Sequence, residues 1–150
     1  MKKLLLTLLG VACLSLSASA VHPTKNDESA IVKPMGTCFR TNVSVCGGGR
    51  CWSYTSGWTC FQTPIYFERT TGEPTESTLS LTDADVDKDQ QTMKLTFSEF
   101  SSDLNVVFSD NTSFNPESGW PSESGVTRVV ILPGKYAIQG NTAIVKVAAN

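Results

Sequence analysis

The chain has 150 residues, with 12 Lys and Arg against 14 Asp and Glu, so its formal net charge is −2. That length is typical of one domain and argues against a multidomain protein. Only 17% of the residues are charged, below the roughly 25% usual in globular proteins, and the acidic balance disfavours nucleic acid as a partner. The hydrophobic content of 40% is too high for a wholly disordered chain.

The N-terminus has the three parts of a secretory signal peptide. Lys2 and Lys3 form a basic start, an apolar run follows, and Ala18 and Ala20 supply the small residues of a cleavage site. The apolar run is shorter than the about 20 residues that a membrane-spanning helix needs. We therefore expect residues 1–20 to be removed during export from a bacterial cell, which gives a secreted or periplasmic protein.

Cys13 leaves a second outcome open for this leader. The residues from Leu9 to Cys13 resemble a degenerate lipoprotein box, but Gly10 stands where a large aliphatic residue is usual. An acyl chain on Cys13 would anchor the protein to a membrane. A cell-surface lipoprotein is thus the less favoured alternative.

Beyond the leader, the sequence divides into an arm and a body. Residues 21–37 mix Pro, Lys, Asp and Glu without periodicity, which indicates a flexible arm or linker. Residues 38–150 are predicted to form a single β-rich domain. Within it, residues 38–60 form a cysteine-rich hairpin and residues 61–150 form a meander or sandwich.

Short segments of the body alternate apolar and polar residues between turn signals. In residues 92–100, for example, Met93, Leu95 and Phe97 alternate with polar side chains. No helical period of useful length appears, so the predicted fold class is all-β, an antiparallel sandwich or meander with an N-terminal disulfide-stapled hairpin. The expected strands of the body are residues 64–67, 78–81, 92–100, 104–108, 126–132, 135–138 and 142–147.

Four cysteines lie close together, at positions 38, 46, 51 and 60. An even count in an exported chain favours two disulfides. A metal site is disfavoured because C-x2-C pairs and a nearby His are both absent. The glycine-rich loop from Gly47 to Arg50 is typical of a hairpin turn and suggests how the cysteines pair.

The nested pairing Cys38–Cys60 with Cys46–Cys51 fits an antiparallel hairpin. Its register places Phe39 opposite Trp58. Cys38 then needs one extra residue on the second strand to meet Cys60, and Gly57 is a natural place for that bulge. We therefore predict these two disulfides.

Aromatic residues make the hairpin a candidate binding surface. Trp52, Tyr54 and Trp58 belong either to the core or to an exposed platform that stacks on a sugar or contacts a protein. Trp120 lies in a loop rich in turn residues, and we expect it to be better exposed. The candidate binding residues are Arg50, Trp52, Tyr54, Trp58 and Trp120.

Aspartates at positions 83, 85 and 87 match the opening of a calcium-binding loop. Such a loop needs Gly at its sixth position and Glu at its twelfth, but Lys88 and Lys94 stand there. We therefore expect a solvated loop between two strands, and no metal or other cofactor.

Catalytic side chains are scarce. The one His, His22, lies in the predicted arm, and the cysteines are expected to be oxidised, which excludes the usual nucleophile and base pairs. Glu99 and Asp103 would serve glycoside hydrolysis only if they converged. We therefore expect a protein that is not an enzyme.

Taken together, these features predict an exported bacterial protein that is non-catalytic, with a binding or structural role at the cell envelope or outside the cell. Its expected partner is a protein or a glycan of the envelope. Two specific alternatives stay open. One is an inhibitor that presents the loop from Gly47 to Arg50 to another protein, and the other is carbohydrate or cell-wall binding through Trp52, Trp58 and Trp120.

Overall fold

The computed structural model describes residues 38–63 and 65–150, apart from the side chains of residues 54–56. The predicted signal peptide and arm, with Cys13 and His22, lie outside the described residues. Within the described part of the chain, no helix has the length and apolar character needed to cross a membrane.

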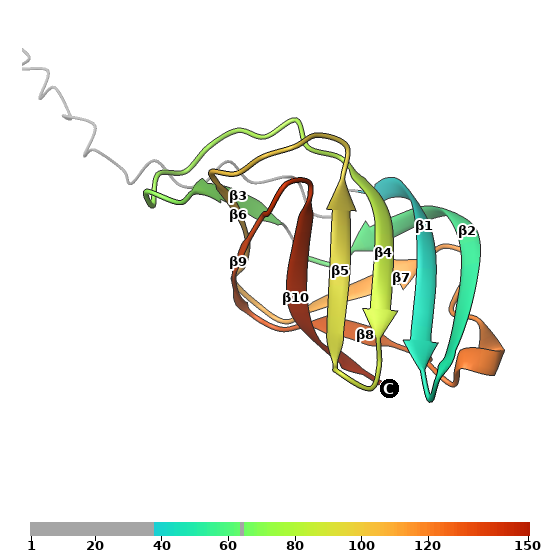
Figure 1. Ribbon diagram of the computed structural model, residues 1–150. Helices are drawn as coiled ribbons and strands as arrows, with labels where there is room; N and C mark the ends of the chain where they lie inside the picture. The colour runs from blue at the N-terminus through green and yellow to red at the C-terminus, as the bar shows by residue number, and fades with distance from the viewer. Residues whose placement is uncertain (1–37, 64) are drawn as a thin grey trace, which may run out of the picture.

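Strands account for nearly all the regular structure of the described residues (Figure 1). They are β1 (Cys38–Gly47), β2 (Arg50–Phe61), β3 (Tyr66–Arg69), β4 (Leu81–Asp87), β5 (Thr92–Phe97), β6 (Leu104–Phe108), β7 (Thr112–Pro116), β8 (Val129–Ile131), β9 (Gly134–Ala137) and β10 (Thr142–Ala149). One 3-10 helix, η1 (Ser122–Ser124), precedes β8. The all-β prediction is confirmed.

Seven of these strands close into a barrel in the order β1-β2-β7-β8-β10-β5-β4. The barrel closes where β1 pairs with β4 in parallel, whereas its other ladders are antiparallel. The remaining strands form a small sheet, β3-β6-β9, beside the barrel (Figure 1). The predicted meander or sandwich has free edge strands, whereas the observed strands close into a barrel. Closure protects strand edges that would otherwise be free to pair with other chains.

The core consists of the inward side chains of the barrel together with phenylalanines that join it to the small sheet. Val45, Met93 and Leu95 are fully buried inside the barrel. Phe67 of β3 packs edge-on against Phe97 of β5, with ring centroids 5.9 Å apart. Burying each such aromatic side chain stabilises the fold by about 1.5–3 kcal/mol, so these contacts hold the two sheets together.

Several segments of the body differ from the expected strands; of the strand expected at residues 126–132, for example, only Val129–Ile131 form one. Residues 83–87 were expected in a loop, but they belong to β4, because Ala84 and Val86 alternate inward while the aspartates face outward. Strand β4 therefore begins at Leu81, where a strand was expected to end. β7 was not predicted, because Phe114 is its one large apolar residue among Thr, Ser, Asn and Pro.

The hairpin prediction is confirmed in its disulfides, which join Cys38 to Cys60 and Cys46 to Cys51. The turn between β1 and β2 is tighter than expected, since only Gly48 and Gly49 lie between the paired strands. Both have positive φ, 59° and 76°, as a two-residue hairpin turn requires. Two disulfides indicate an oxidising, extracytoplasmic environment.

The expected bulge is present, and it changes which residues face the core. Thr41 pairs with Gly57 while Asn42 pairs with Thr55, so Ser56 is the extra residue. Gly57 takes a φ of 82°. Beyond this bulge the register differs from our expectation: Phe39 lies opposite Thr59, and Trp58 lies opposite Arg40.

Candidate functional site

The bulge in β2 turns its two tryptophans to opposite faces of the strand. Before the bulge, Trp52 lies opposite the fully buried Val45 and is half-buried itself. After the bulge, Trp58 faces outward and is 51% exposed. The structure therefore separates Trp52 from Trp58 and does not combine them in one platform. Tyr54 lies in β2 between them, and its side chain is outside the described part of the structure.

Trp52 instead comes together with Trp120. Strand β2 pairs with β7 only through Thr59–Phe61, and toward the hairpin tip the segment after β7 lies beside it. Between the two is a hollow of about 370 Å³, a size that suits a small ligand. Its lining consists of Trp52, Ser53, Ser118, Gly119, Trp120, Pro121 and Glu123.

Trp120 is less exposed than we expected from its turn-rich loop. Its ring packs on Phe114 of the core, with centroids 6.1 Å apart, and the side chain is half-buried. Its Nε1 is buried and has no hydrogen-bond partner among the described residues. The loop turns back onto the barrel at Gly119, whose φ is 79° and whose N–H donates to the Pro116 carbonyl.

Helix η1 fixes the wall of the hollow that the segment after β7 forms. The Ser124 side chain is buried, and its hydroxyl donates to the Pro121 carbonyl over 2.6 Å. The backbone N–H of Ser124 donates to the same carbonyl over 3.0 Å. These bonds fix the segment that carries Trp120, so the wall is formed before any ligand arrives.

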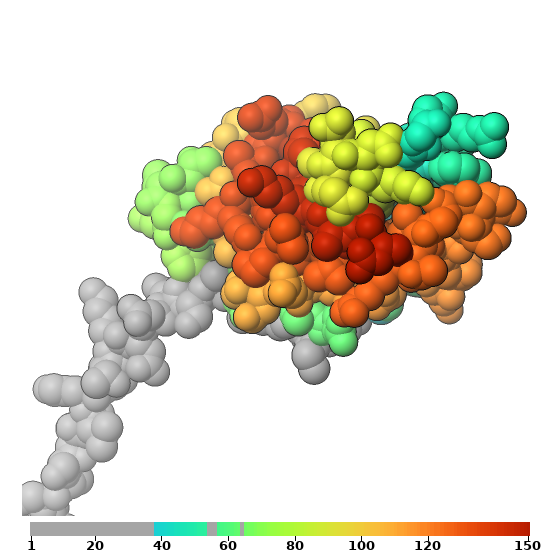
Figure 2. Space-filling view, turned by 90° about the horizontal axis from the view of Figure 1, so that it is seen from below, coloured from blue at the N-terminus to red at the C-terminus, as the bar shows by residue number. Residues whose placement is uncertain are grey.

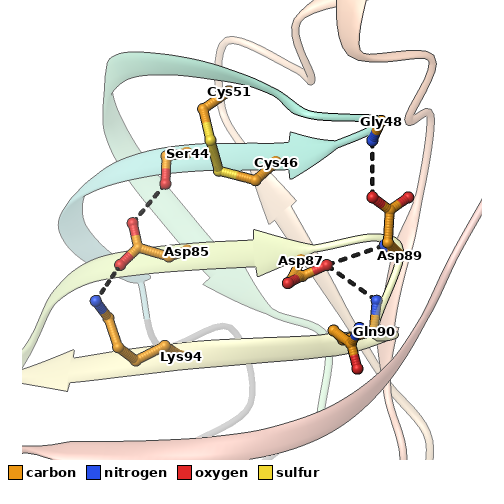
Figure 3. The surroundings of a disulfide bond; sticks show 9 residues. All are labelled: Ser44, Cys46, Gly48, Cys51, Asp85, Asp87, Asp89, Gln90 and Lys94. Atoms are coloured by element: carbon orange, nitrogen blue, oxygen red, sulfur yellow. Dashed lines mark hydrogen bonds and ion pairs between the residues drawn. A yellow bond between two sulfur atoms is a disulfide. The ribbon is translucent and has the colours of Figure 1, made fainter.

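The hairpin tip is tied to the same end of the barrel. The Gly48 N–H donates to Asp89 Oδ2 over 2.7 Å (Figure 3), and the Lys88 N–H donates to the Cys46 carbonyl over 2.9 Å. Lys88 Nζ also donates to the Ser124 carbonyl over 2.9 Å. Figure 2 shows the β4–β5 turn, the hairpin and the segment after β7 side by side at this end of the molecule. The tip is thus held in place by its neighbours.

Arg50 begins β2 beside that tip. It is exposed and, because side chains alternate along a strand, lies on the same face of β2 as Trp52. Its guanidinium has no hydrogen-bond or ion-pair partner in the described part of the chain. Arg50 is not among the residues that line the hollow.

Each aspartate of β4 accepts a hydrogen bond or forms an ion pair within the chain. Asp83 accepts a hydrogen bond from Asn42, and Asp85 accepts one from Ser44 and pairs with Lys94 Nζ at 2.7 Å (Figure 3). Asp87 accepts the N–H groups of the following turn. Across residues 38–63 and 65–150, no group of three His, Cys, Asp or Glu side chains is placed to hold a metal ion.

Glu99 and Asp103, the acid pair considered for hydrolysis, lie in the segment between β5 and β6. Asp103 Oδ2 accepts a bond from Arg69 Nη1 over 2.6 Å, and its other oxygen accepts one from the Ser101 hydroxyl. Glu99 is exposed. The described geometry gives Asp103 a role in holding this loop to β3.

Comparison of the chain with protein-family models, with curated proteins and with solved structures found no match. The arrangement of side chains around the hollow is therefore the basis for assigning a function.

Proposed function

We propose that the protein is an extracytoplasmic binding protein without catalytic activity, and that the hollow between Trp52 and Trp120 binds a saccharide ring. The export route that fits this role is cleavage of residues 1–20 and release to the periplasm or the medium, with acylation at Cys13 as the alternative.

The observation that carries the proposal is the meeting of two tryptophans from distant parts of the chain at one hollow. Their rings, together with Pro121, supply an apolar wall of the kind on which the apolar face of a pyranose stacks. Ser53, Ser118 and Glu123 also line the hollow and supply polar groups. A mostly apolar hollow with a few polar groups is the usual form of a small-ligand site.

Oligosaccharide titration tests this function. Wild-type protein is titrated with a panel of neutral oligosaccharides that includes cellotetraose and chitotetraose, and tryptophan fluorescence and calorimetry report binding. Trp52→Leu keeps an apolar side chain but removes the aromatic face, so we expect affinity to fall at least about tenfold, or about 1.4 kcal/mol. The unfolding midpoint of each variant is measured alongside.

Phe100→Ala is the matched control, because it removes an aromatic side chain that is 83% exposed and lies outside the hollow. We expect its affinity to equal that of wild type. Failure of every saccharide to bind, or equal affinity in wild type and a folded Trp52→Leu variant, would contradict the proposal.

The hairpin tip supports a second candidate function, the binding of another protein through Arg50. Arg50 is exposed and lacks an ionic partner among the described residues, and the tip beside it is fixed by the Cys46–Cys51 disulfide and by Asp89. A rigid loop loses little conformational entropy on binding. If this function is correct, proteins captured from the native surroundings by wild type are lost with Arg50→Ala and retained with Lys146→Ala, which alters another exposed cation.

A further inference from the structure

Arg40 and Trp58 form a cross-strand pair on the outer face of the same hairpin. They lie directly opposite each other in the ladder between β1 and β2. Side chains in such positions have Cβ atoms about 4.5–5.5 Å apart, so one ligand reaches both. Trp58 is one of the few large hydrophobic side chains that the described structure leaves exposed.

The backbone beneath this pair is fixed on both sides. The Cys38–Cys60 disulfide lies two residues away along each strand, and the bulge at Gly57 lies next to Trp58. The Trp58 carbonyl also accepts a bond from the Glu117 N–H over 2.7 Å. A ligand at this position meets a preformed surface, which reduces the entropic cost of binding.

Arg40 is an exposed cation of β1. Arg69, Lys94 and Lys135 each pair with a carboxylate, but Arg40 forms no ion pair or side-chain hydrogen bond within the described residues. A guanidinium presents a planar fork of donors that matches a carboxylate. Arg40 is therefore available to bind an anionic group.

Arg40 also borders a second hollow, of about 290 Å³, lined by Arg40, Thr41, Asn42 and Thr82. Asn42 Nδ2 donates to Asp83 Oδ1 over 3.0 Å, which orients the amide and leaves its Oδ1 as an acceptor. The Thr82 hydroxyl is likewise held near Asp83. The hollow thus offers hydroxyl and amide groups of the kind that bind sugar hydroxyls.

We propose that Arg40, Trp58 and this polar hollow form a second binding site, which takes a saccharide ring bearing a carboxylate, as in a uronic acid. The ring stacks on Trp58, its carboxylate binds the Arg40 guanidinium, and its hydroxyls bind Asn42 and Thr82. This site differs from the hollow at Trp52 in its place on β2 and in the charge of its ligand.

A carboxylated saccharide fits this surface better than a protein partner does. Stable protein interfaces bury about 1,200 Å² or more, and their centres are rich in apolar side chains. Here Trp58 is the one large exposed hydrophobic side chain at the site, and the adjoining hollow is lined by polar residues alone. One aromatic ring, one cation and several polar groups match a single charged sugar.

The test uses tetragalacturonate and its fully methyl-esterified form as probes, titrated into the complete exported protein. We expect tetragalacturonate to bind at least about tenfold more tightly than the neutral ester, and that preference to weaken as salt rises. Arg40→Gln should remove the preference for the acid. Trp58→Ala should weaken both probes at least about tenfold when the comparison is made in a Trp52→Leu background, in which the other hollow has lost its stacking face. Phe100→Ala should bind both as wild type does.

Arg40 and Trp58 are exposed, so we expect both variants to unfold at the wild-type temperature. The proposal is overturned if wild type does not bind tetragalacturonate, or if Arg40→Gln keeps the preference for the acid. A protein partner that is lost on Trp58→Ala, without any binding of tetragalacturonate, also overturns it. The neutral-saccharide titration of the Trp52 hollow is unaffected by either outcome.

Discussion

The aliphatic stem of Lys88 lies across Gly47, so closely that a Cβ on Gly47 would stand 2.5 Å from Lys88 Cγ. The end of the same side chain donates to the Ser124 carbonyl over 2.9 Å. Lys88 therefore links the hairpin tip to η1, and it does so because Gly47 has no side chain. This contact connects the tip to the wall of the candidate saccharide site.

We predict that Gly47→Ala destabilises the protein by about 1–2 kcal/mol. The new methyl group displaces the Lys88 stem and breaks its hydrogen bond to Ser124. Urea unfolding measures the loss. In a Lys88→Ala background the same Gly47→Ala change should cost much less, because the obstructing stem is gone. Equal costs in the two backgrounds would show that the contact does not constrain the tip.

Gly57 supports a second prediction, because its φ of 82° lies in the left-handed region. Gly57→Ala should cost about 1–2 kcal/mol, since that conformation is strained for a residue with a Cβ. Gly57→Asn should cost less, because Asn tolerates the left-handed region better. Unfolding of the disulfide-bonded protein in urea measures both. An Asn variant as unstable as the Ala variant would show that space, and not backbone strain, limits this position.

The hairpin was predictable from sequence because its information is local. Cysteine spacing and the glycines at the tip define one turn, and the offset between Cys38 and Cys60 requires an extra residue near Gly57. The barrel was not predictable in the same way, because its closure depends on β1 pairing with β4 across a long stretch of chain. Nothing in either segment alone specifies that pairing.

In strand β4, the acidic motif drew attention away from the alternation of apolar and polar residues that is typical of a strand. Alternating aspartates suggested a calcium loop, but the residues between them, Ala84 and Val86, are small and apolar and face the core. Giving that alternation more weight than the acidic motif would have identified the strand. The same acids then become part of the outer face, where Asp85 binds Ser44 and Lys94.

The candidate site was predictable in its residues but not in their grouping. Trp52, Trp58 and Trp120 were all singled out from sequence. Their grouping depends on the bulge, which turns Trp58 outward, and on the loop that brings Trp120 against Phe114. Whether Trp58 faces outward depends on the position of the bulge to within one residue. The contact between Trp120 and Phe114 requires tertiary packing that no local sequence pattern encodes.

Asp85 gives a prediction about pH. Its carboxylate accepts a hydrogen bond from Lys94 and attracts its charge, and both effects raise the pKa of Lys94 above its ordinary value of 10.5. A group whose pKa is raised by folding stabilises the fold while it is protonated. That contribution is full below pH 10.5 and is lost as pH rises through the raised pKa of Lys94.

The variant that tests this is Lys94→Met, which keeps the aliphatic stem and removes the charge. The difference in unfolding free energy between wild type and variant should stay constant from neutral pH to about pH 10 and then shrink. Lys146→Met, which removes an exposed cation of the neighbouring strand β10, serves as the control. A difference that stays constant through the alkaline range would mean that the ion pair with Asp85 does not form in solution.

Trp120 gives the last prediction, because its ring and its N–H have opposite effects on stability. The ring packs on Phe114, whereas the buried Nε1 lacks a hydrogen-bond partner among the described residues. Trp120→Ala should cost about 2–4 kcal/mol through lost packing. Trp120→Phe should stay within about 1 kcal/mol of wild type, because it removes a donor whose unsatisfied burial costs about 1–3 kcal/mol.

The same pair of variants separates stability from binding at the hollow. Trp120→Phe keeps an aromatic face, so its affinity for a neutral oligosaccharide should stay within a few-fold of wild type. Trp120→Ala should lose that affinity even at temperatures where it is fully folded. If the Phe variant is as unstable as the Ala variant, then the indole N–H is bonded in solution and the wall of the hollow depends on that bond. If both variants bind as wild type does, the ring of Trp120 supports the wall of the hollow without touching the ligand, and Trp52 alone provides the stacking surface.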